Sequence, residues 1–344
     1  MIEITEGTSI RIPGETSLFI RFDYDPKKVD FIKSLDPTHF HKKEKLWEAP
    51  LGFLQVILDE FTSEDDISLR LQEPRPQLTP RALELGPYTT QPFEYQLEGI
   101  RHGLLHDKWL LLDEPGLGKT LQMIYLAQER QRREGIKHCL IICGVNTLKE
   151  NWRKEIKKHS HLSCCILGER TTRTGRTVVG TISQRVEHLK QGVEEFFCIT
   201  NIETIRNEEI VKQLLRKENG FDMIVVDEIH HCRSHQSQQG ANLLKLSAAR
   251  YCVGLTGTLM MNDPLDAHVP LKWVGAERAS YTACKHYYCD LNGDIVCGYK
   301  NLDTLQLQLE HYSLRRRKTL LNLPPKNIVT EYVELNPKQE ELYE

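Results

Sequence analysis

The stretch Trp109-Leu-Leu-Leu-Asp-Glu-Pro-Gly-Leu-Gly-Lys-Thr120 decides the fold. Its first four residues are apolar and predict a buried strand, and the residues that follow it, 121–127, predict a helix. A glycine-containing loop between a strand and a helix N-terminus is typical of a phosphate site, because backbone N–H groups and the helix dipole both attract an anion there. The sequence therefore predicts a phosphate-binding loop within an α/β fold.

The loop residues have distinct expected roles. Gly116 and Gly118 allow the backbone to approach the anion, Lys119 supplies a positive charge for the β- and γ-phosphates, and the Thr120 hydroxyl can ligate Mg²⁺. The strict loop pattern has glycine where Asp113 stands, so the match is partial and a structural turn is the alternative. The candidate nucleotide-binding residues of the loop are Asp113, Glu114, Pro115, Gly116, Leu117, Gly118, Lys119 and Thr120.

A second apolar run ends in acidic residues about 110 positions downstream. It reads Phe221-Asp-Met-Ile-Val-Val-Asp-Glu-Ile-His230 and predicts a strand that ends in two carboxylates. Asp227 can hold Mg²⁺, and Glu228 can orient and deprotonate an attacking water, as in-line phosphoryl transfer requires. Together with Lys119 these two residues are the candidate catalytic set. A solvated acidic turn is the alternative, and the pairing with a phosphate loop argues against it.

Short apolar runs alternate with helical patterns from Tyr95 onward. The expected strands are 109–112, 139–143, 197–200, 223–226 and 250–255. Such runs, separated by helices, predict a parallel sheet with helices on both faces. The expected fold class is therefore α/β, of the RecA-like type once the resemblance described below is taken into account.

The first 73 residues predict a separate small α/β domain. Strands are expected at 18–22 and 45–49, and amphipathic helices at 26–35 and 53–61. Five prolines between Pro74 and Pro92 rule out a regular element there and predict a linker over 74–92.

Charge restricts the ways in which this chain can meet nucleic acid. The formal net charge is −3, and residues 1–73 hold nine Lys and Arg against fifteen Asp and Glu. No global positive field attracts a polyanion, so any DNA path must be a local basic stripe. On the N-terminal domain the candidate patch is Lys42, Lys43 and Lys45.

The chain lacks signs of export or membrane insertion. No apolar run approaches the length of about 20 residues that spans a bilayer, and the N-terminus is acidic where a signal peptide is basic. We expect an intracellular, soluble protein without a membrane partner, whose ten scattered cysteines are reduced. Cys284, His286, Cys289 and Cys297 allow a zinc site, but their spacing fits no common ligand pattern and favours buried thiols.

Several segments resemble a known family in sequence and in order. Asp227-Glu-Ile-His230 resembles the DEAH box of superfamily 2 helicases, and 113–120 is similar to the DEMGLGKT motif of their Swi/Snf branch, with Pro115 in place of methionine. Segments 93–96, 140–152, 199–206 and 255–262 resemble four further motifs. The resemblance implies that Gln96 contacts adenine, that ATP and Mg²⁺ are bound, and that a RecA-like lobe spans 93–270.

Two weaker resemblances concern the branch of the family. The segment after residue 262, with Leu314-Arg-Arg316 and Leu323-Pro-Pro-Lys326, is similar to annealing helicases and fork remodelers. Phe22-Asp-Tyr-Asp-Pro26 followed by Leu46-Trp47 is similar to the HepA-related (HARP) module that those proteins carry. They imply that 1–73 is HARP-like and engages branched DNA, and that 271–344 forms a helical protrusion and the lead into a second lobe. The run Arg315–Lys318 is then expected on that protrusion, near DNA.

The expected function is an ATP-dependent, DNA-associated translocase that moves on duplex DNA and remodels or anneals branched substrates. No second-lobe motif occurs in the 344 residues, which indicates a shortened or split protein with weak activity of its own. Two alternatives remain: a non-hydrolysing nucleotide- and DNA-binding module, and a strand-separating helicase.

Overall fold

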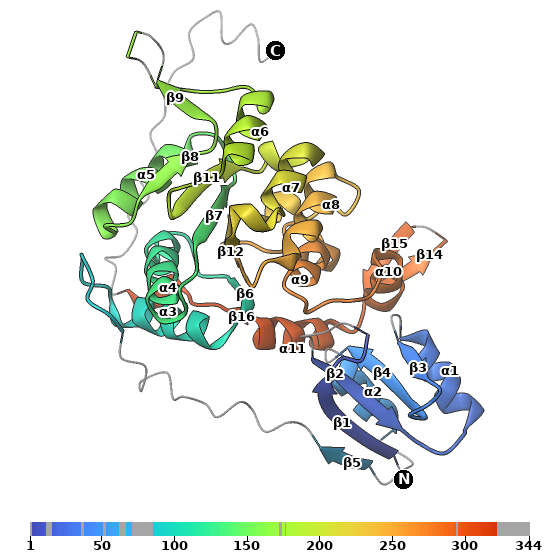
Figure 1. Ribbon diagram of the computed structural model, residues 1–344. Coiled ribbons are helices and arrows are strands. Elements are labelled where there is room, and N and C mark those ends of the chain that lie inside the picture. The colour runs from blue at the N-terminus through green and yellow to red at the C-terminus, as the bar shows by residue number, and fades with distance from the viewer. Residues whose placement is uncertain are drawn as a thin grey trace, which may run out of the picture.

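The computed structural model describes residues 2–11, 16–35, 38–50, 53–61, 67–70, 85–171, 174–175, 177–293 and 295–321. Within them lie a large lobe built on a parallel sheet and a smaller N-terminal unit beside it (Figure 1). Most of the expected linker, 74–84, and the segment 323–326 fall outside the described residues. The described part of the linker, 85–92, has no helix or strand.

The large lobe is organised by a seven-stranded sheet in the order β16-β6-β13-β12-β7-β11-β8, in which every neighbouring pair is parallel. Five strands confirm the expected ones, and they are β6 (Lys108–Leu111), β7 (His138–Cys143), β11 (Phe197–Asn201), β12 (Phe221–Asp227) and β13 (Tyr251–Leu255). The edge strands β8 (Cys164–Ile166) and β16 (Ser313–Leu314) were not predicted. They are too short to show a periodic pattern.

Helices cover both faces of this sheet, and the alternation of side chains along each strand feeds two cores. Trp109 and Leu111 pack on one face with α3 (Glu94–Leu105), α4 (Lys119–Glu134) and α5 (Leu148–His159). Leu110 and Leu112 face the other side, where α6 to α11 pack. These are α6 (Ile182–Gln191), α7 (Glu208–Leu214), α8 (Gln238–Lys245), α9 (His268–Trp273), α10 (Tyr281–Tyr288) and α11 (Leu302–Tyr312). The expected α/β class with a doubly covered parallel sheet is confirmed.

The strand order brings three loops together. β6, β13 and β12 are neighbours, so the segments after Leu111, Leu255 and Asp227 leave the same edge of the sheet side by side. The carboxyl edge of a parallel sheet is where open α/β folds place their ligand sites. Two hairpins project elsewhere: β9 (Glu169–Thr171) with β10 (Thr177–Val179), and β14 (Cys289–Asn292) with β15 (Ile295–Tyr299).

The N-terminal unit is a five-stranded sheet in the order β3-β4-β2-β1-β5 with two helices. The expected elements are present as β2 (Thr16–Arg21), α1 (Pro26–Ser34), β4 (Leu46–Pro50) and α2 (Leu54–Phe61). Asp25 caps α1 by accepting a hydrogen bond from the backbone N–H of Lys27, and Pro26 begins the helix. Three strands were not predicted: β1 (Ile2–Thr8), β3 (His39–His41) and β5 (Ile67–Arg70).

A buried carboxylate holds this small unit together. Glu48 is 4% exposed and accepts hydrogen bonds from Ser9 and from Ser17 (3.0 Å), and it lies 2.6 Å from Nε2 of His41. Burial acts to raise the pKa of Glu48, but the hydrogen bonds from Ser9, His41 and Ser17 outweigh it and leave the pKa lowered. The carboxylate is therefore charged in the folded protein.

We expect Glu48→Gln to destabilise the protein by about 1–3 kcal/mol at pH 7, because charged hydrogen bonds are lost inside the fold. A lowered pKa means that this stability is fully present above the ordinary Glu value of 4.5 and is lost as the pH falls through the folded-state pKa. Melting curves from pH 7 to 3.5 should show the two proteins converging in acid. Glu94→Gln, at a side chain 72% exposed, is the control and should change little. A pH-independent difference would contradict the assignment.

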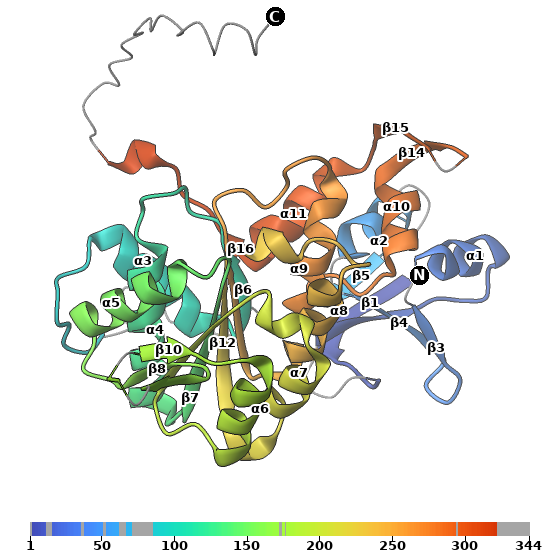
Figure 2. The same ribbon diagram turned by 90° about the horizontal axis from the view of Figure 1, so that it is seen from above.

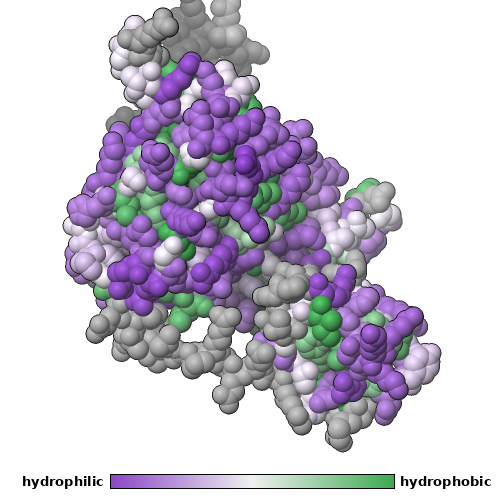
Figure 3. All heavy atoms as spheres, viewed as in Figure 1, coloured by the Kyte–Doolittle hydropathy of each residue, from purple (hydrophilic) through white to green (hydrophobic). Residues whose placement is uncertain are grey.

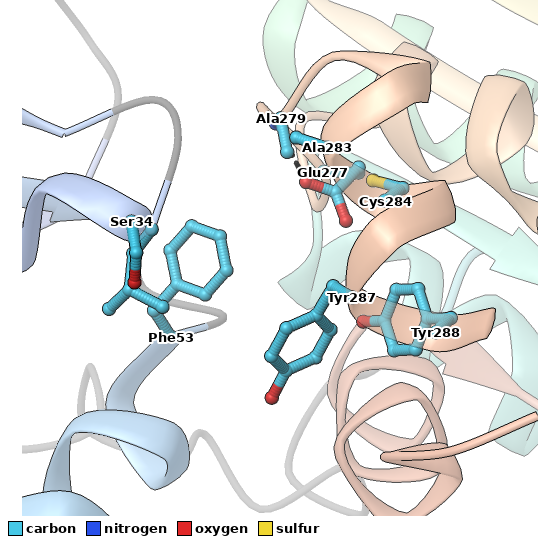
Figure 4. Close-up of a pocket in the computed structure, with 9 residues that line it drawn as sticks. Ser34, Phe53, Glu277, Ala279, Ala283, Cys284, Tyr287 and Tyr288 are labelled. Atoms are coloured by element: carbon cyan, nitrogen blue, oxygen red, sulfur yellow. Dashed lines mark hydrogen bonds between the residues drawn. The ribbon is translucent and has the colours of Figure 1, made fainter. Parts of the chain in front are cut away.

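The N-terminal unit lies against α10 and α11 of the large lobe in both ribbon views (Figures 1 and 2). Nη1 of Arg278, just before α10, donates to the Ser17 hydroxyl at 2.9 Å. Phe53 packs against both the N-terminal core and the core under α10, and Tyr287 faces it across a small pocket (Figure 4). The contact joins polar and apolar groups from both units.

The basic run 315–318 does not lie on a helical protrusion, contrary to the expectation. α10 and α11 are helices of the expected region, but Ser313 and Leu314 leave α11 to pair with β6 at the edge of the central sheet. Arg315 to Lys318 then follow the phosphate loop, because parallel pairing with β6 directs the chain along the same path. The local helical pattern could not reveal this pairing.

The view of the large lobe in Figure 3 is mostly hydrophilic, with scattered apolar patches. In the part of the chain that the structure describes, no helix is both long enough and apolar enough to cross a bilayer. All ten cysteines lie in that part as free thiols, and only Cys297 is exposed.

Candidate functional site

The phosphate loop has the backbone that an anion cradle needs. Gly116 and Gly118 have φ of 93° and 73°, in the left-handed region that favours glycine. Gly118 caps α4, so the loop leads directly into a helix N-terminus. A Cβ on Gly118 would lie 2.3 Å from Nε2 of Gln96, and space as well as backbone conformation therefore requires glycine there.

Gln96 lies against the loop as well, on α3. Its side chain is 5% exposed; Nε2 donates to the Leu117 carbonyl at 3.2 Å, and Oε1 accepts from the backbone N–H of Phe93 at 3.0 Å. Both ends of the amide thus bond within the chain. Gln96 couples α3 to the loop, whereas its expected contact with adenine stays a prediction.

Lys119 begins α4 beneath the loop, and its Nζ donates to the Asp113 carbonyl at 2.7 Å. Burial lowers the pKa of Lys119, and the nearby charges of Glu228, Asp227 and Asp113 oppose that effect. The structure therefore brings the predicted cation and the two predicted carboxylates into one site. Thr120 follows in the first turn of α4 and is half-buried.

Asp227 and Glu228 end β12 at the same edge and have different surroundings. Asp227 accepts hydrogen bonds from Nε1 of Trp152 (3.0 Å) and from the backbone N–H of Glu228 (3.1 Å). Burial raises the pKa of Asp227, whereas hydrogen bonding by His230 lowers the pKa of Glu228. Glu228 also has φ of 52°, a left-handed conformation that is uncommon for a residue with a Cβ and is often found at functional sites.

Thr256 links this pair to the loop after β13. It is fully buried, and its hydroxyl lies 2.9 Å from Nδ1 of His230 and donates to Glu228 at 3.4 Å. The same oxygen accepts from the backbone N–H of Thr258. Pro115 of the phosphate loop packs against Gly257, since a Cβ on Gly257 would lie 2.8 Å from Cδ of Pro115. Direct contacts therefore join Glu228 and the phosphate loop to the loop 256–258.

Asp113, where the loop pattern has glycine, is fully buried and paired with Arg316. The guanidinium donates through Nε to Oδ1 at 3.0 Å and through Nη2 to Oδ2 at 2.6 Å. It also bonds the Gln122 side chain (2.7 Å) and the Tyr95 carbonyl. A planar, bidentate pair of this kind fits arginine only. Asp113 thus acts as an anchor for residues 313–318.

Three polar residues at the ends of β11 and β13 are enclosed by protein. Thr200, Asn201 and Thr256 are at most 2% exposed, and Asn201 bonds Glu203 and Thr204. Asn146 and Thr147 are exposed.

The side chains that lie close enough to share a metal ion differ from the cysteines and the histidine considered from the sequence. In the described segments, the side chains near enough to share an ion are Cys165, His188 and Glu195. Cys284 and Cys289 are buried at α10 and at the start of β14, and Cys297 lies exposed on β15.

Sequence reasoning missed two contributors, Trp152 and Arg316. Trp152 was noticed only as part of a motif, and nothing local links it to Asp227. The sequence holds one indication of a partner such as Arg316. Asp113 stands in place of the first loop glycine and follows four apolar residues, and a carboxylate that is buried in this way requires a partner.

Comparisons with known proteins find a family profile and several distant relatives. The profile of the SNF2-related domain matches residues 95–344. The ATP-dependent helicase FUN30 of Saccharomyces cerevisiae is 26% identical over 73% of this chain and 23% of its own length. The DNA annealing helicase and endonuclease ZRANB3 of Bos taurus is 28% identical over 67% of this chain and 21% of its length. The probable helicase D10 of Escherichia phage T5 is 26% identical over 46% and 28%.

A solved structure shares the fold. The SWI2/SNF2 ATPase core of Sulfolobus solfataricus in complex with dsDNA superimposes with a TM-score of 0.53 at 22% identity, over 76% of this chain and 53% of that one. This chain spans about a quarter of the length of the curated relatives above and about half of the solved core.

Proposed function

The chain belongs to the SNF2-related domain family, and from that premise we propose that it is the ATP-binding lobe of a motor that translocates on double-stranded DNA. The observation that carries the proposal is the meeting of Lys119 with Asp227 and Glu228 at the carboxyl edge of neighbouring strands. A cation beside a glycine loop and two carboxylates are the parts that ATP hydrolysis requires.

We assign the nucleotide contacts as follows. Backbone N–H groups of Gly116 and Gly118 and the ammonium of Lys119 would hold the phosphates, and Gln96, which packs against the loop, would contact the base. Thr120 and Asp227 would ligate Mg²⁺, whose charge offsets that of the phosphates when it is bound. The donor set fits, because hydroxyl and carboxylate oxygens are the ligands that Mg²⁺ prefers.

Glu228 is the proposed general base. Its pKa is lowered by the hydrogen bond with His230, so the carboxylate is charged at neutral pH and can orient a water and take its proton. Asp227, fixed by Trp152 and by a backbone N–H, has no free rotation and suits a metal ligand. Thr256 to Thr258 would couple hydrolysis at Glu228 to the surface that faces DNA.

We assign the N-terminal unit, residues 1–73, to DNA engagement of the HARP type, and the motor to the annealing-helicase or fork-remodelling branch. Lys42, Lys43 and Lys45 occupy the exposed turn between β3 and β4, and Phe40 and Trp47 pack at its base with ring centroids 5.1 Å apart. Cations next to an exposed aromatic ring suit phosphates and unpaired bases together. A second RecA-like lobe would close the ATP site and supply further charge, within an intracellular, DNA-associated protein.

Phosphate release tests the enzyme class. We expect ATP hydrolysis to rise at least tenfold on adding duplex or forked DNA when the second lobe is present, and this chain alone to bind nucleotide with little turnover. Hydrolysis that is absent with and without DNA, in the two-lobed protein, would favour a non-hydrolysing binding module instead.

Two displacement assays separate translocation from unwinding. A translocase on duplex DNA displaces the third strand of a triplex without separating the duplex, whereas a strand-separating helicase releases a strand from a partial duplex. We expect triplex displacement that requires ATP and little strand release.

A further inference from the structure

Residues 313–318 run alongside the end of β6 and the phosphate loop as far as Gly116. β16 pairs with β6 in parallel, with Ser313 opposite Leu110, and the backbone N–H of Leu112 donates to the Leu314 carbonyl at 2.8 Å. The contact continues past the sheet: the backbone N–H of Glu114 donates to the Arg316 carbonyl at 3.1 Å, and that of Lys318 donates to the Glu114 carboxylate at 2.8 Å. Arg316 locks the segment in place through buried Asp113.

This path places the Lys318 side chain over the loop's open turn. A Cβ built on Gly116 would lie 3.4 Å from Cε and 3.7 Å from Nζ of Lys318. Gly116 itself is exposed, so the ammonium meets the loop from its solvent side, while Lys119 meets it from below. The charge of Lys318 also acts to lower the pKa of Lys119, as expected for two ammonium groups that face one site.

Two cations around one anion cradle repel each other, and a bound polyanion removes that repulsion. Among the described residues, Lys318 forms no ion pair through its ammonium. The backbone of Lys318 is nevertheless held in place. Its N–H donates to the Glu114 carboxylate, and Arg316, two residues before it, pairs with Asp113. The segment 313–318 thus holds an ammonium group, which forms no ion pair within the described residues, on a backbone that is fixed by hydrogen bonds. This is the arrangement expected of a phosphate-binding residue.

We propose that Lys318 is a second phosphate-binding lysine of the nucleotide site, supplied by a segment about 200 residues downstream of the loop. The inference rests on the proposed function and adds to it a residue outside the recognised loop. It makes the path of residues 313–318 part of the nucleotide site, so that binding of a nucleotide and placement of this segment stabilise one another.

Nucleotide binding to this chain tests the proposal. Displacement of a fluorescent mant-ADP by ATP, ADP and adenosine gives three affinities for each variant. We expect Lys318→Gln to weaken ATP and ADP by about tenfold, because one charge-assisted contact is lost, and to leave adenosine unchanged. Lys318→Arg keeps the charge and should stay within about threefold of the parent. Arg317→Gln, an exposed neighbour with the same change in charge, is the matched control.

The outcomes separate the two proposals. If Lys119→Ala no longer binds ATP while Lys318→Gln binds ATP with the affinity of the parent, the proposed role of Lys318 is overturned and the nucleotide site stands. Equal losses for ATP and adenosine would also overturn it, since the contact would not be to phosphate. If neither ATP nor ADP displaces mant-ADP from the parent chain, or Lys119→Ala binds ATP normally, the nucleotide site itself is wrong. Equal melting temperatures show that Lys318→Gln is folded.

Discussion

Glu228→Gln is expected to lower DNA-stimulated ATP turnover by about a thousandfold while nucleotide affinity is kept. Glutamine preserves the size of the side chain and can still accept a hydrogen bond from Thr256, but it cannot take a proton from water. General-base catalysis contributes about 10²- to 10⁴-fold, so loss of the base alone accounts for the expected fall. The measurement is kcat by phosphate release in the two-lobed protein with saturating DNA, alongside the dissociation constant of ATP.

The contrast with Lys119→Ala makes this result specific. Lys119 meets the nucleotide in its ground state, so its removal should weaken ATP binding, whereas Glu228→Gln should change only the chemical step. Glu208→Gln, at a side chain 82% exposed on α7, is the matched control and should turn over normally. Retention of more than a tenth of the turnover by Glu228→Gln would show that another group takes the proton.

Arg316→Gln is expected to destabilise the protein by about 3–5 kcal/mol. The guanidinium is 10% exposed and Asp113 is fully buried, so the substitution leaves a buried carboxylate without its bidentate partner. For a unit of this size each kcal/mol lowers Tm by about 2–4 °C, so the expected fall is roughly 10 °C. Near-ultraviolet circular dichroism on heating measures it.

A double variant distinguishes an ion pair from loss of packing. Asp113→Asn combined with Arg316→Gln removes both charges, and we expect it to melt above Arg316→Gln alone because no unpaired charge remains. Arg317→Gln, the exposed neighbour, should stay within about 0.5 kcal/mol of the parent. If Arg316→Gln melts like Arg317→Gln, the buried pair contributes nothing to stability.

Much of the fold followed from local patterns. The continuous apolar runs from Trp109 to Leu112 and before Asp227 predicted buried strands of a sheet with helices on both faces, and both faces are covered as expected. Strands β1, β5, β8 and β16 could not be predicted in this way. Strands β5, β8 and β16 are short edge segments that become strands because a neighbour offers unpaired backbone groups, whereas β1 lies inside its sheet between β2 and β5.

The sequence by itself determined the loop, its glycines, the cation and the two carboxylates, because backbone conformation and hydrophobic period depend on residues next to one another in the chain. Only the tertiary structure decided which distant residues complete the site. Trp152 reaches Asp227 across 75 residues, and Arg316 reaches Asp113 across 203. Such partners are selected by the order of strands in the sheet, which brings the ends of β6, β12 and β16 together, and no local pattern along the chain encodes that order.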